Sequence, residues 1–245
     1  MMLTETTYRP WELPSRPWIF AMRWHDLLFM HWPVPEQALL PVIPSSLAVD
    51  TCDGTAWIGV VPFRMTGVRP RALPPVPWLS AFPELNVRTY VTTGGKPGVW
   101  FLSLDAANRL AVRMARLVFH LPYYDARMAS ECSDEEVHYT SQRTHRGAPS
   151  AVFRGHYRPI GPVFHASPGT LEHWLTERYC LYAVDRHGQV WRGDIHHARW
   201  PLQPAEAEVG VNTMTHQIGL TLPDTPPLLH FARRQDVVGW TPRRV

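Results

Sequence analysis

ELNVRTYVTTGGKPGVWFLSLD, residues 84–105, contains the clearest secondary-structure pattern of the sequence. In its first half polar and apolar residues alternate, which is typical of a β-strand, because successive side chains point to opposite faces. The GGKPG segment at 94–98 is rich in turn residues, and an apolar run follows it. The stretch therefore predicts a hairpin with strands over 84–93 and 99–105.

The residues after this hairpin are predicted to form the main helix of the chain, over 106–119. Asp105 is suited to cap its N-terminus, because a side-chain oxygen at that position accepts hydrogen bonds from the first free amides. Apolar residues recur at i, i+4 and i+7 along one helical face. They are Leu110, Met114 and Leu117. A second helix is predicted over 168–179, with Ser167 as its N-cap.

Short strand patterns account for most of the remaining chain. They cover residues 18–32, 55–68, 126–133, 136–143, 151–158, 180–185, 189–196, 228–234 and 236–241. Many short strands with two main helices inserted predict a mainly β fold with α insertions, built as an antiparallel barrel or sandwich. The proline-rich segment 69–83 is interpreted as a stiff loop rather than a linker, because the strand pattern continues on both sides. A single domain over 1–245 is therefore expected.

The composition indicates a globular protein that binds neither nucleic acid nor a membrane. The 245 residues carry a net charge of +3 at pH 7, which is too small for a nucleic-acid footprint. No apolar run approaches the ~18 residues that a membrane-spanning helix needs, and the N-terminus carries no signal-peptide pattern. Cys52, Cys132 and Cys180 are far apart and odd in number, which argues against a disulfide framework. A cytoplasmic location is expected.

Motifs for metal and cofactor binding are missing from the sequence. His25 and His31 share a strand face but are six residues apart, and no HExxH motif or cysteine pair has metal-ligand spacing. There is also no GxGxxG fingerprint, phosphate-binding loop or GxSxG elbow. The sequence therefore predicts no metal site and no cofactor.

Several stretches together resemble the YqjF-like family. They are RWHDLLFMHWPVP (23–35), DGTAWIGVVPFRMTGVRP (53–70), ELNVRTYV (84–91), KPGVWFLSLDAANRLAV (96–112) and LPYYDARM (121–128). The resemblance covers roughly residues 15–240. This family has no settled activity, and its fold is similar to that of acetoacetate decarboxylase. The resemblance implies an antiparallel β-barrel, closed or nearly closed, with a cavity for a small molecule.

The resemblance also implies a departure from acetoacetate decarboxylase. In that enzyme the Schiff-base lysine follows a short helix, within a Pro-Lys-Lys segment. The corresponding segment here is Leu121-Pro122-Tyr123-Tyr124, and the single lysine of the chain, Lys96, lies in the predicted hairpin turn. A solvated turn does not supply the desolvation that depresses a lysine pKa. The chain is therefore not expected to be a Schiff-base acetoacetate decarboxylase.

The polar face of the strand 84–90 is the main candidate site. Its polar residues are Glu84, Asn86, Arg88 and Tyr90. The usual inside–outside rule would place this face in water, whereas the resemblance implies that it lines a cavity. In a cavity, Arg88 would clamp a carboxylate through its planar fork. Glu84 would act as a catalytic acid or base if burial raised its pKa, and Asn86 and Tyr90 would contact the ligand.

Three further residues are candidates for the same site. Tyr123 would be a catalytic group that donates a hydrogen bond to a ligand oxygen, and Tyr124 would contact the ligand. The alternative is a tyrosine that packs at the rim with its hydroxyl in water. Arg109, Arg113 and Arg116 form a row along the main helix, which is better explained as a solvated face. Of that row only Arg109 is kept as a ligand contact, because it is nearest the strand that feeds the helix.

Two functions remain open on the sequence. In the first, the chain is an enzyme that acts on a small organic acid or carbonyl compound without a Schiff base. In the second, it is a non-catalytic ligand-binding or regulatory barrel that uses the same pocket. Either way the expected partner is a small, anionic molecule, and assembly into a homo-oligomer is left open.

Overall fold

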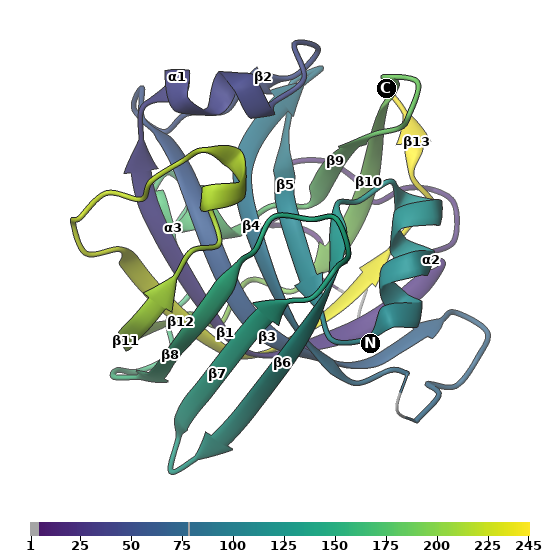
Figure 1. Cartoon of the computed structure of the whole chain (residues 1–245). Coiled ribbons are helices and arrows are strands. Elements are labelled where there is room, and N and C mark those ends of the chain that lie inside the picture. Colours follow the sequence, from purple (N-terminus) through teal and green to yellow (C-terminus); the bar gives the residue numbers. More distant parts are fainter. Residues whose placement is uncertain (1–4, 78) are drawn as a thin grey trace.

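The computed structural model describes residues 5–77 and 79–245 (Figure 1). Strands dominate these residues. In chain order the elements are β1 (Phe20–Val34), α1 (Glu36–Leu39), a 3-10 turn (Leu40–Val42), β2 (Ala48–Val49), β3 (Ala56–Pro70), β4 (Phe82–Thr93), β5 (Lys96–Ala106), α2 (Arg109–Phe119), β6 (Tyr123–Ser133), β7 (Glu136–Arg143), β8 (Val152–Pro159), α3 (Leu171–Thr176), β9 (Cys180–Val184), β10 (Val190–His197), β11 (Gln203–Asn212), a second 3-10 turn (His216–Ile218), β12 (Leu228–Gly239) and β13 (Arg243–Arg244). The mainly β composition with helical insertions matches the prediction.

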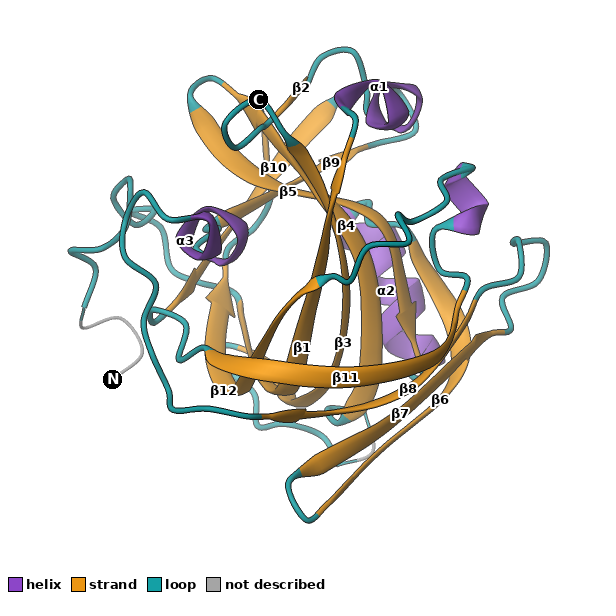
Figure 2. Cartoon of the chain, turned by 90° about the vertical axis from the view of Figure 1, so that its left-hand side faces the viewer, coloured by secondary structure: helices purple, strands orange, loops and turns teal. Residues whose placement is uncertain are grey.

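The strands form one large sheet whose pairings close into two circuits. Both circuits share the run β12-β1-β3-β4-β5. The large circuit closes through β6, β7, β8 and β11, and the small circuit closes through β9 and β10. Figure 2 shows β11 passing in front of β1 and β3, with β8, β7 and β6 continuing below and to the right. The shared run therefore has a different set of strands opposite each of its faces.

The sheet is mixed, which corrects the expectation of a purely antiparallel one. Most pairs are antiparallel, but β5 pairs in parallel with β6 and with β9. The physical reason lies in the connection from β5 to β6, which contains the helix α2. A helical crossover returns the chain in the same direction, whereas a tight hairpin reverses it.

The β4–β5 hairpin is present where the alternation predicted it. Its turn contains Gly94 and Gly95 at φ 56° and 70°, a backbone region that glycine adopts without steric cost. A bulge between Val87 and Arg88 interrupts the β4–β5 register. The proline-rich segment after β3 joins two directly paired strands, because β3 and β4 are neighbours in the sheet.

Both predicted helices exist, but their caps and exposed faces differ from the prediction. The side chain of Asn108 caps α2 by accepting hydrogen bonds from two backbone amides, because Asp105 is still part of β5. The apolar stripe Leu110, Met114 and Leu117 is exposed, and Val112 is the buried residue of α2. The cap of α3 is Thr170 rather than Ser167.

Apolar side chains fill the space on both faces of the shared run. One cluster joins β4 residues such as Leu85 and Val87 to Tyr139 of β7 and Phe153 of β8. On the other face, Phe29 and Phe63 pack with Trp200 in a second cluster. None of the described helices is both long and apolar enough to cross a membrane.

Candidate functional site

The polar residues of β4 lie on one buried face of the sheet. Glu84 is 3% exposed, Asn86 5% and Tyr90 0%, and Arg88 is half-buried. The alternate residues, including Leu85, pack in the cluster that contains β7 and β8. The polar residues therefore face the small-circuit side. This inner polar face, defined by Glu84, Asn86, Arg88 and Tyr90, is interior rather than a wet outer surface.

Glu84 and Tyr123 are in direct contact on this face. The Tyr123 hydroxyl donates a hydrogen bond of 2.9 Å to Glu84 Oε2. Burial raises the pKa of Glu84 to about 8, and the negative charge of Asp105 adds to this rise, while the hydrogen bond from Tyr123 opposes it. Burial and the neighbouring Glu84 hold the pKa of Tyr123 well above its ordinary value. At pH 7 both groups therefore carry their protons for most of the time.

Arg88 is a cation without a carboxylate partner among the described residues. Its Nε is buried and has no hydrogen-bond partner in that part of the chain. The guanidinium carbon lies 5.1 Å from the centre of the Phe29 ring and 6.0 Å from that of Tyr90. Aromatic faces attract a guanidinium but leave its N–H donors unsatisfied. Arg88 is therefore held in place with its Nε–H donor unused by the described residues.

Gly59 of β3 gives Arg88 and His31 the space that they occupy. Gly59 pairs with His31 on one side and with Arg88 on the other. A Cβ atom at this position would lie 3.0 Å from His31 Cδ2 and 3.4 Å from Arg88 Cγ. The missing side chain at Gly59 lets His31 and Arg88 pack against the backbone of β3.

Tyr90 fixes the tautomer of His31. The Tyr90 hydroxyl donates to the carbonyl of Leu175 at 2.8 Å and lies 2.7 Å from His31 Nε2. Since the hydroxyl has only one proton, Nε2 of His31 must be the donor in that contact, which leaves Nδ1 unprotonated. Burial and the nearby Arg88 hold the pKa of His31 well below its usual value, so the ring stays neutral.

Several buried polar atoms without hydrogen-bond partners among the described residues lie on or near the inner polar face. They include His31 Nδ1, Trp57 Nε1, Asn86 Oδ1, Arg88 Nε, Trp200 Nε1 and His230 Nδ1, and further atoms of this kind lie in other parts of the described chain. His230 is opposite Phe29 in the β1–β12 register, and the Phe29 and Trp200 rings are 4.9 Å apart. Native interiors leave few polar atoms unpaired, so these atoms are candidate contacts for a ligand.

Two of the predicted ligand contacts lie away from the inner polar face. Tyr124 is on the opposite side of the sheet, with the guanidinium carbon of Arg143 4.1 Å from its ring centre. Arg109 is the exposed first residue of α2. Neighbouring strand residues point to opposite faces, so Tyr123 and Tyr124 cannot both contact the same ligand.

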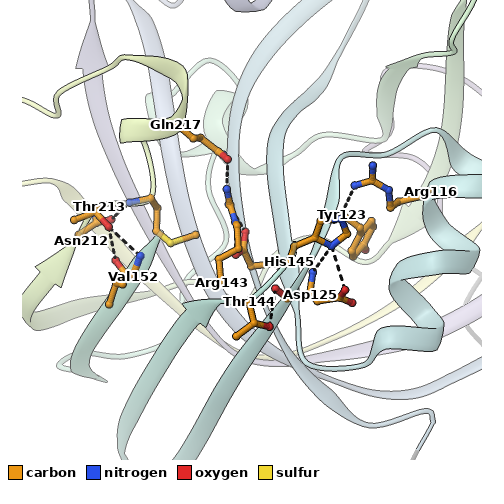
Figure 3. Close-up of polar contacts among 12 residues, drawn as sticks. Arg116, Tyr123, Asp125, Arg143, Thr144, His145, Val152, Asn212, Thr213 and Gln217 are labelled. Atoms are coloured by element: carbon orange, nitrogen blue, oxygen red, sulfur yellow. Dashed lines mark hydrogen bonds and ion pairs between the residues drawn. The ribbon is translucent and has the colours of Figure 1, made fainter. Parts of the chain in front are cut away.

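The opposite side of the sheet contains a buried ion pair that the sequence did not reveal. Arg143 makes two hydrogen bonds to the carboxylate of Asp105, at 2.8 and 2.5 Å, and a third to Gln217. Figure 3 shows Arg143 reaching from the end of β7 to Gln217. The alternation of β7 places Arg143 on the same face as the buried Tyr139, and this was the available signal. The prediction of Asp105 as a helix cap is wrong, because its carboxylate pairs with Arg143.

The structure offers no built metal site within residues 5–77 and 79–245. No group of three or more histidine, cysteine, aspartate or glutamate side chains is arranged there to hold an ion. Two surface cavities, of about 360 and 400 Å³, are lined by residues outside the inner polar face. The distinctive chemistry of this face lies in Glu84, Tyr123 and Arg88.

Comparison with known proteins gives one family and one fold. The model of the DUF2071 family, described as "Uncharacterized conserved protein", matches residues 21–236. The uncharacterised protein YqjF of Bacillus subtilis (strain 168) is 49% identical over 233 residues, covering 95% of each chain. These matches span nearly the whole of the strand network described above.

Solved structures with a similar fold include three enzymes. The enduracididine biosynthesis enzyme MppR complexed with pyruvate has a TM-score of 0.63 at 9% identity and covers 94% of this chain and 91% of that one. An acetoacetate decarboxylase-like enzyme from Sphingomonas wittichii RW1 scores 0.62 at 13% identity, covering 93% and 92%. An acetoacetate decarboxylase scores 0.64 at 11% identity, covering 94% and 90%. At these identities the likeness is one of fold alone.

Proposed function

This chain belongs to the DUF2071 family, and from that premise we propose that it binds a small organic acid with a carbonyl group on the inner polar face. The proposal includes proton exchange between that ligand and Glu84, without a Schiff base. One observation carries it: Arg88 Nε and Asn86 Oδ1 are buried without partners on the same face as the protonated Glu84. The Arg88 guanidinium, the Asn86 amide and the Glu84 carboxyl therefore follow one another along one face of β4.

Arg88 is the proposed anchor for the ligand carboxylate. A guanidinium matches a carboxylate through two parallel hydrogen bonds, and no described acidic residue forms an ion pair with Arg88. Glu84 is four residues away on the same strand face, about 13 Å along the strand at ~3.3 Å per residue. Because both side chains are long, the proposed ligand is a molecule of a few carbon atoms that would bridge their ends, with Asn86 beside it.

Glu84 is the proposed proton carrier. A carboxyl with a pKa of about 8 is partly ionised near neutral pH, which suits a group that must both accept and donate a proton. The ionised carboxylate would remove a proton from the carbon next to the ligand carbonyl. The C–H bond breaks, its electron pair forms the enolate, and Glu84 later returns a proton to the same carbon. Tyr123 would orient Glu84 through its hydrogen bond.

The fold supports a ligand-enclosing arrangement. We take the ring-like pairing of the sheet as a decarboxylase-like β-barrel, in which the inner polar face is part of the wall of a binding cavity. The similar MppR structure is described as a complex with pyruvate, so a short oxo acid is a suitable first probe. Lys96 lies at the start of β5 with its ammonium 5.1 Å from the centre of the Trp11 ring, and it takes no part in the proposed chemistry.

A ligand-binding protein without turnover is the second candidate. The observation that favours it is the pair Tyr123-Tyr124 at the position where the resemblance implies lysines. In that case Glu84 would donate a hydrogen bond to the bound acid and keep its proton. Both candidates need Arg88, and only the first needs Glu84 to ionise.

Deuterium exchange into pyruvate tests the proposal and separates the two candidates. Pyruvate is incubated with the protein in D2O near pH 8, and the loss of its methyl proton signal is followed by NMR. Wild type is expected to accelerate the exchange. Glu84→Gln should reduce the acceleration by about 100-fold or more, while saturation-transfer signals still report binding. Arg88→Met should lose both.

The outcomes of this experiment are distinct. Binding of pyruvate without exchange supports the second candidate and overturns proton transfer. Binding that survives Arg88→Met overturns the anchor. If pyruvate and acetoacetate both fail to bind the wild-type protein, the assignment of a small oxo acid is wrong.

A further inference from the structure

A cavity of about 360 Å³ lies between the N-terminal segment and strands β10 and β13. Figure 1 shows the purple N-terminal segment passing behind this region. The cavity lining consists of residues 11–16 together with Lys96, Arg192, Asp194 and Arg243. It lies at the lower end of the size range of small-molecule sites, which begins near ~300 Å³. The residues of the inner polar face do not line it.

Positive charge exceeds negative charge in this lining. Its cations are Arg16, Lys96, Arg192 and Arg243, and its anions are Glu12 and Asp194. Asp194 is neutralised locally, since its carboxylate is 3.2 Å from Arg192 Nε and 4.0 Å from Arg243 Nε. Glu12 is exposed to solvent. Lys96 and Arg16 form no ion pair with any described acidic residue.

The cavity wall also contains buried polar atoms that lack hydrogen-bond partners in the described chain, two donors and one acceptor. The Nε1 of Trp11, the Nε of Arg192 and the Oδ1 of Asp194 have no hydrogen-bond partner among the described residues. Arg192 is 5% exposed, and its contact with Asp194 is close but not aligned as a hydrogen bond. Unpaired buried donors beside free cations favour a ligand that supplies several acceptor oxygens.

We propose that this cavity is a second binding site, for a small anion that carries a phosphate or diphosphate group. Arginine forks and a lysine point charge are the side chains that suit phosphate oxygens. A single carboxylate carries one negative charge and two acceptor oxygens, fewer than a phosphate or diphosphate offers to these cations. A diphosphate has enough charge and oxygen atoms to contact Arg16, Lys96 and Arg243 together. The Trp11 ring beside Lys96 would form the apolar wall of the site.

The chain offers a matched pair of variants for testing this site. Arg243 lines the cavity, whereas its neighbour Arg244 is equally exposed but does not. Pyrophosphate binding is measured by calorimetry in low salt, with wild type, Lys96→Ala, Arg243→Ala and Arg244→Ala. The first two variants should weaken binding about tenfold each, as expected for the loss of a charge-assisted contact. Arg244→Ala should stay within about twofold of wild type, because only its contribution to the general surface charge is lost.

A second readout does not depend on charge removal. Because Trp11 lines the cavity, pyrophosphate should change the tryptophan fluorescence of wild type, and the change should be largely lost in Trp11→Phe. The proposal is overturned if wild type shows no saturable binding, or if Arg244→Ala weakens binding as much as Arg243→Ala. Citrate binding more tightly than pyrophosphate would overturn the assignment to phosphate. Glu84→Gln should leave pyrophosphate binding unchanged, so this test is independent of the proposed oxo-acid chemistry.

Discussion

The Tyr123 hydroxyl lies 2.9 Å from Glu84 Oε2, and this contact joins two segments 39 residues apart at the inner polar face. Burial raises the pKa of Glu84 from 4.5 to about 8. The folded protein therefore holds a proton that the unfolded chain has already lost between these two pH values. Since the folded state binds more protons in this window, its stability decreases as pH rises through it.

Glu84→Gln should remove this pH dependence. The free energy of unfolding of the wild type, relative to that of the variant, is expected to fall by about 1.4 kcal/mol per pH unit between the two pKa values. The variant should be close to wild type at pH 4.5 and more stable than wild type at pH 8.5. Urea unfolding at several pH values measures the difference. Parallel curves for the two proteins would mean that Glu84 ionises normally.

Arg143→Ala should be strongly destabilising. It leaves the buried carboxylate of Asp105 without its partner, and breaking a buried ion pair costs about 3–5 kcal/mol. Arg158→Ala is the control, because Arg158 and Glu206 form an exposed pair whose loss should cost less than about 1 kcal/mol. The double variant Asp105→Asn/Arg143→Met should recover most of the loss. Chemical denaturation that shows equal effects for Arg143→Ala and Arg158→Ala would contradict this.

Gly59→Ala should displace the His31 and Arg88 side chains at the inner polar face. The new Cβ would lie 3.0 Å from His31 Cδ2, and overpacking of this kind costs about 1–3 kcal/mol. Displaced His31 and Arg88 side chains should also weaken pyruvate binding. Gly210→Ala is the control, since the nearest atom to its Cβ is the Arg154 carbonyl oxygen at 3.9 Å. Thermal unfolding and saturation-transfer NMR measure both effects, and equal behaviour of the two variants would refute the role of Gly59.

Local sequence patterns predicted the strands and turns that are determined by neighbouring residues. Alternation over 84–90 gave the correct strand and the correct common face for its polar residues. Whether that face was interior depended on which strands cover it, and strand pairing across the chain is not encoded locally. The position of β6 beside β5 explains both the mixed sheet and the contact between Tyr123 and Glu84.

The sequence-based predictions were wrong where one residue pattern is compatible with both a buried and an exposed position. Leu110, Met114 and Leu117 have the spacing of a buried helical stripe, yet they are exposed because α2 packs through Val112. Asp105 precedes the helix and resembles a cap, but it binds Arg143 across the sheet. His31 depends on Tyr90, which is 59 residues away. Such long-range partners determine the site and leave no signal in the spacing of one sequence.

Acetoacetate and borohydride together should leave the chain unmodified. Schiff-base trapping needs a lysine that is unprotonated near neutral pH, which requires desolvation or a close cation. Tyr123 and Tyr124 cannot form an imine, and Lys96 is on another part of the sheet from Glu84. Intact-mass spectrometry is expected to detect no reduced adduct. A stable mass increase that maps to Lys96 would show that imine chemistry occurs after all.

Arg88→Met should separate stability from binding. Removing the guanidinium also removes a buried Nε that lacks an acceptor, and an unsatisfied buried donor costs about 1–3 kcal/mol. The lost attraction to Phe29 opposes this gain by about 0.5–2 kcal/mol. The methionine stem should preserve the packing over the ring. The unfolding free energy of the variant is therefore expected to stay within about 1 kcal/mol of wild type, while pyruvate binding is lost.

Arg178→Met is the matched control for that substitution. Arg178 is also buried and lies over Tyr90, but it pairs with Asp50 at 2.5 Å and donates to the carbonyl of Trp174. Loss of the Arg178 guanidinium should lower the free energy of unfolding by about 2 kcal/mol or more, because its hydrogen bonds to Asp50 and Trp174 are broken. Thermal or urea unfolding of both variants measures the contrast. If Arg88→Met destabilises the protein as much as Arg178→Met does, Arg88 is a structural cation with a satisfied partner, and the inner polar face has no free group to hold an anion.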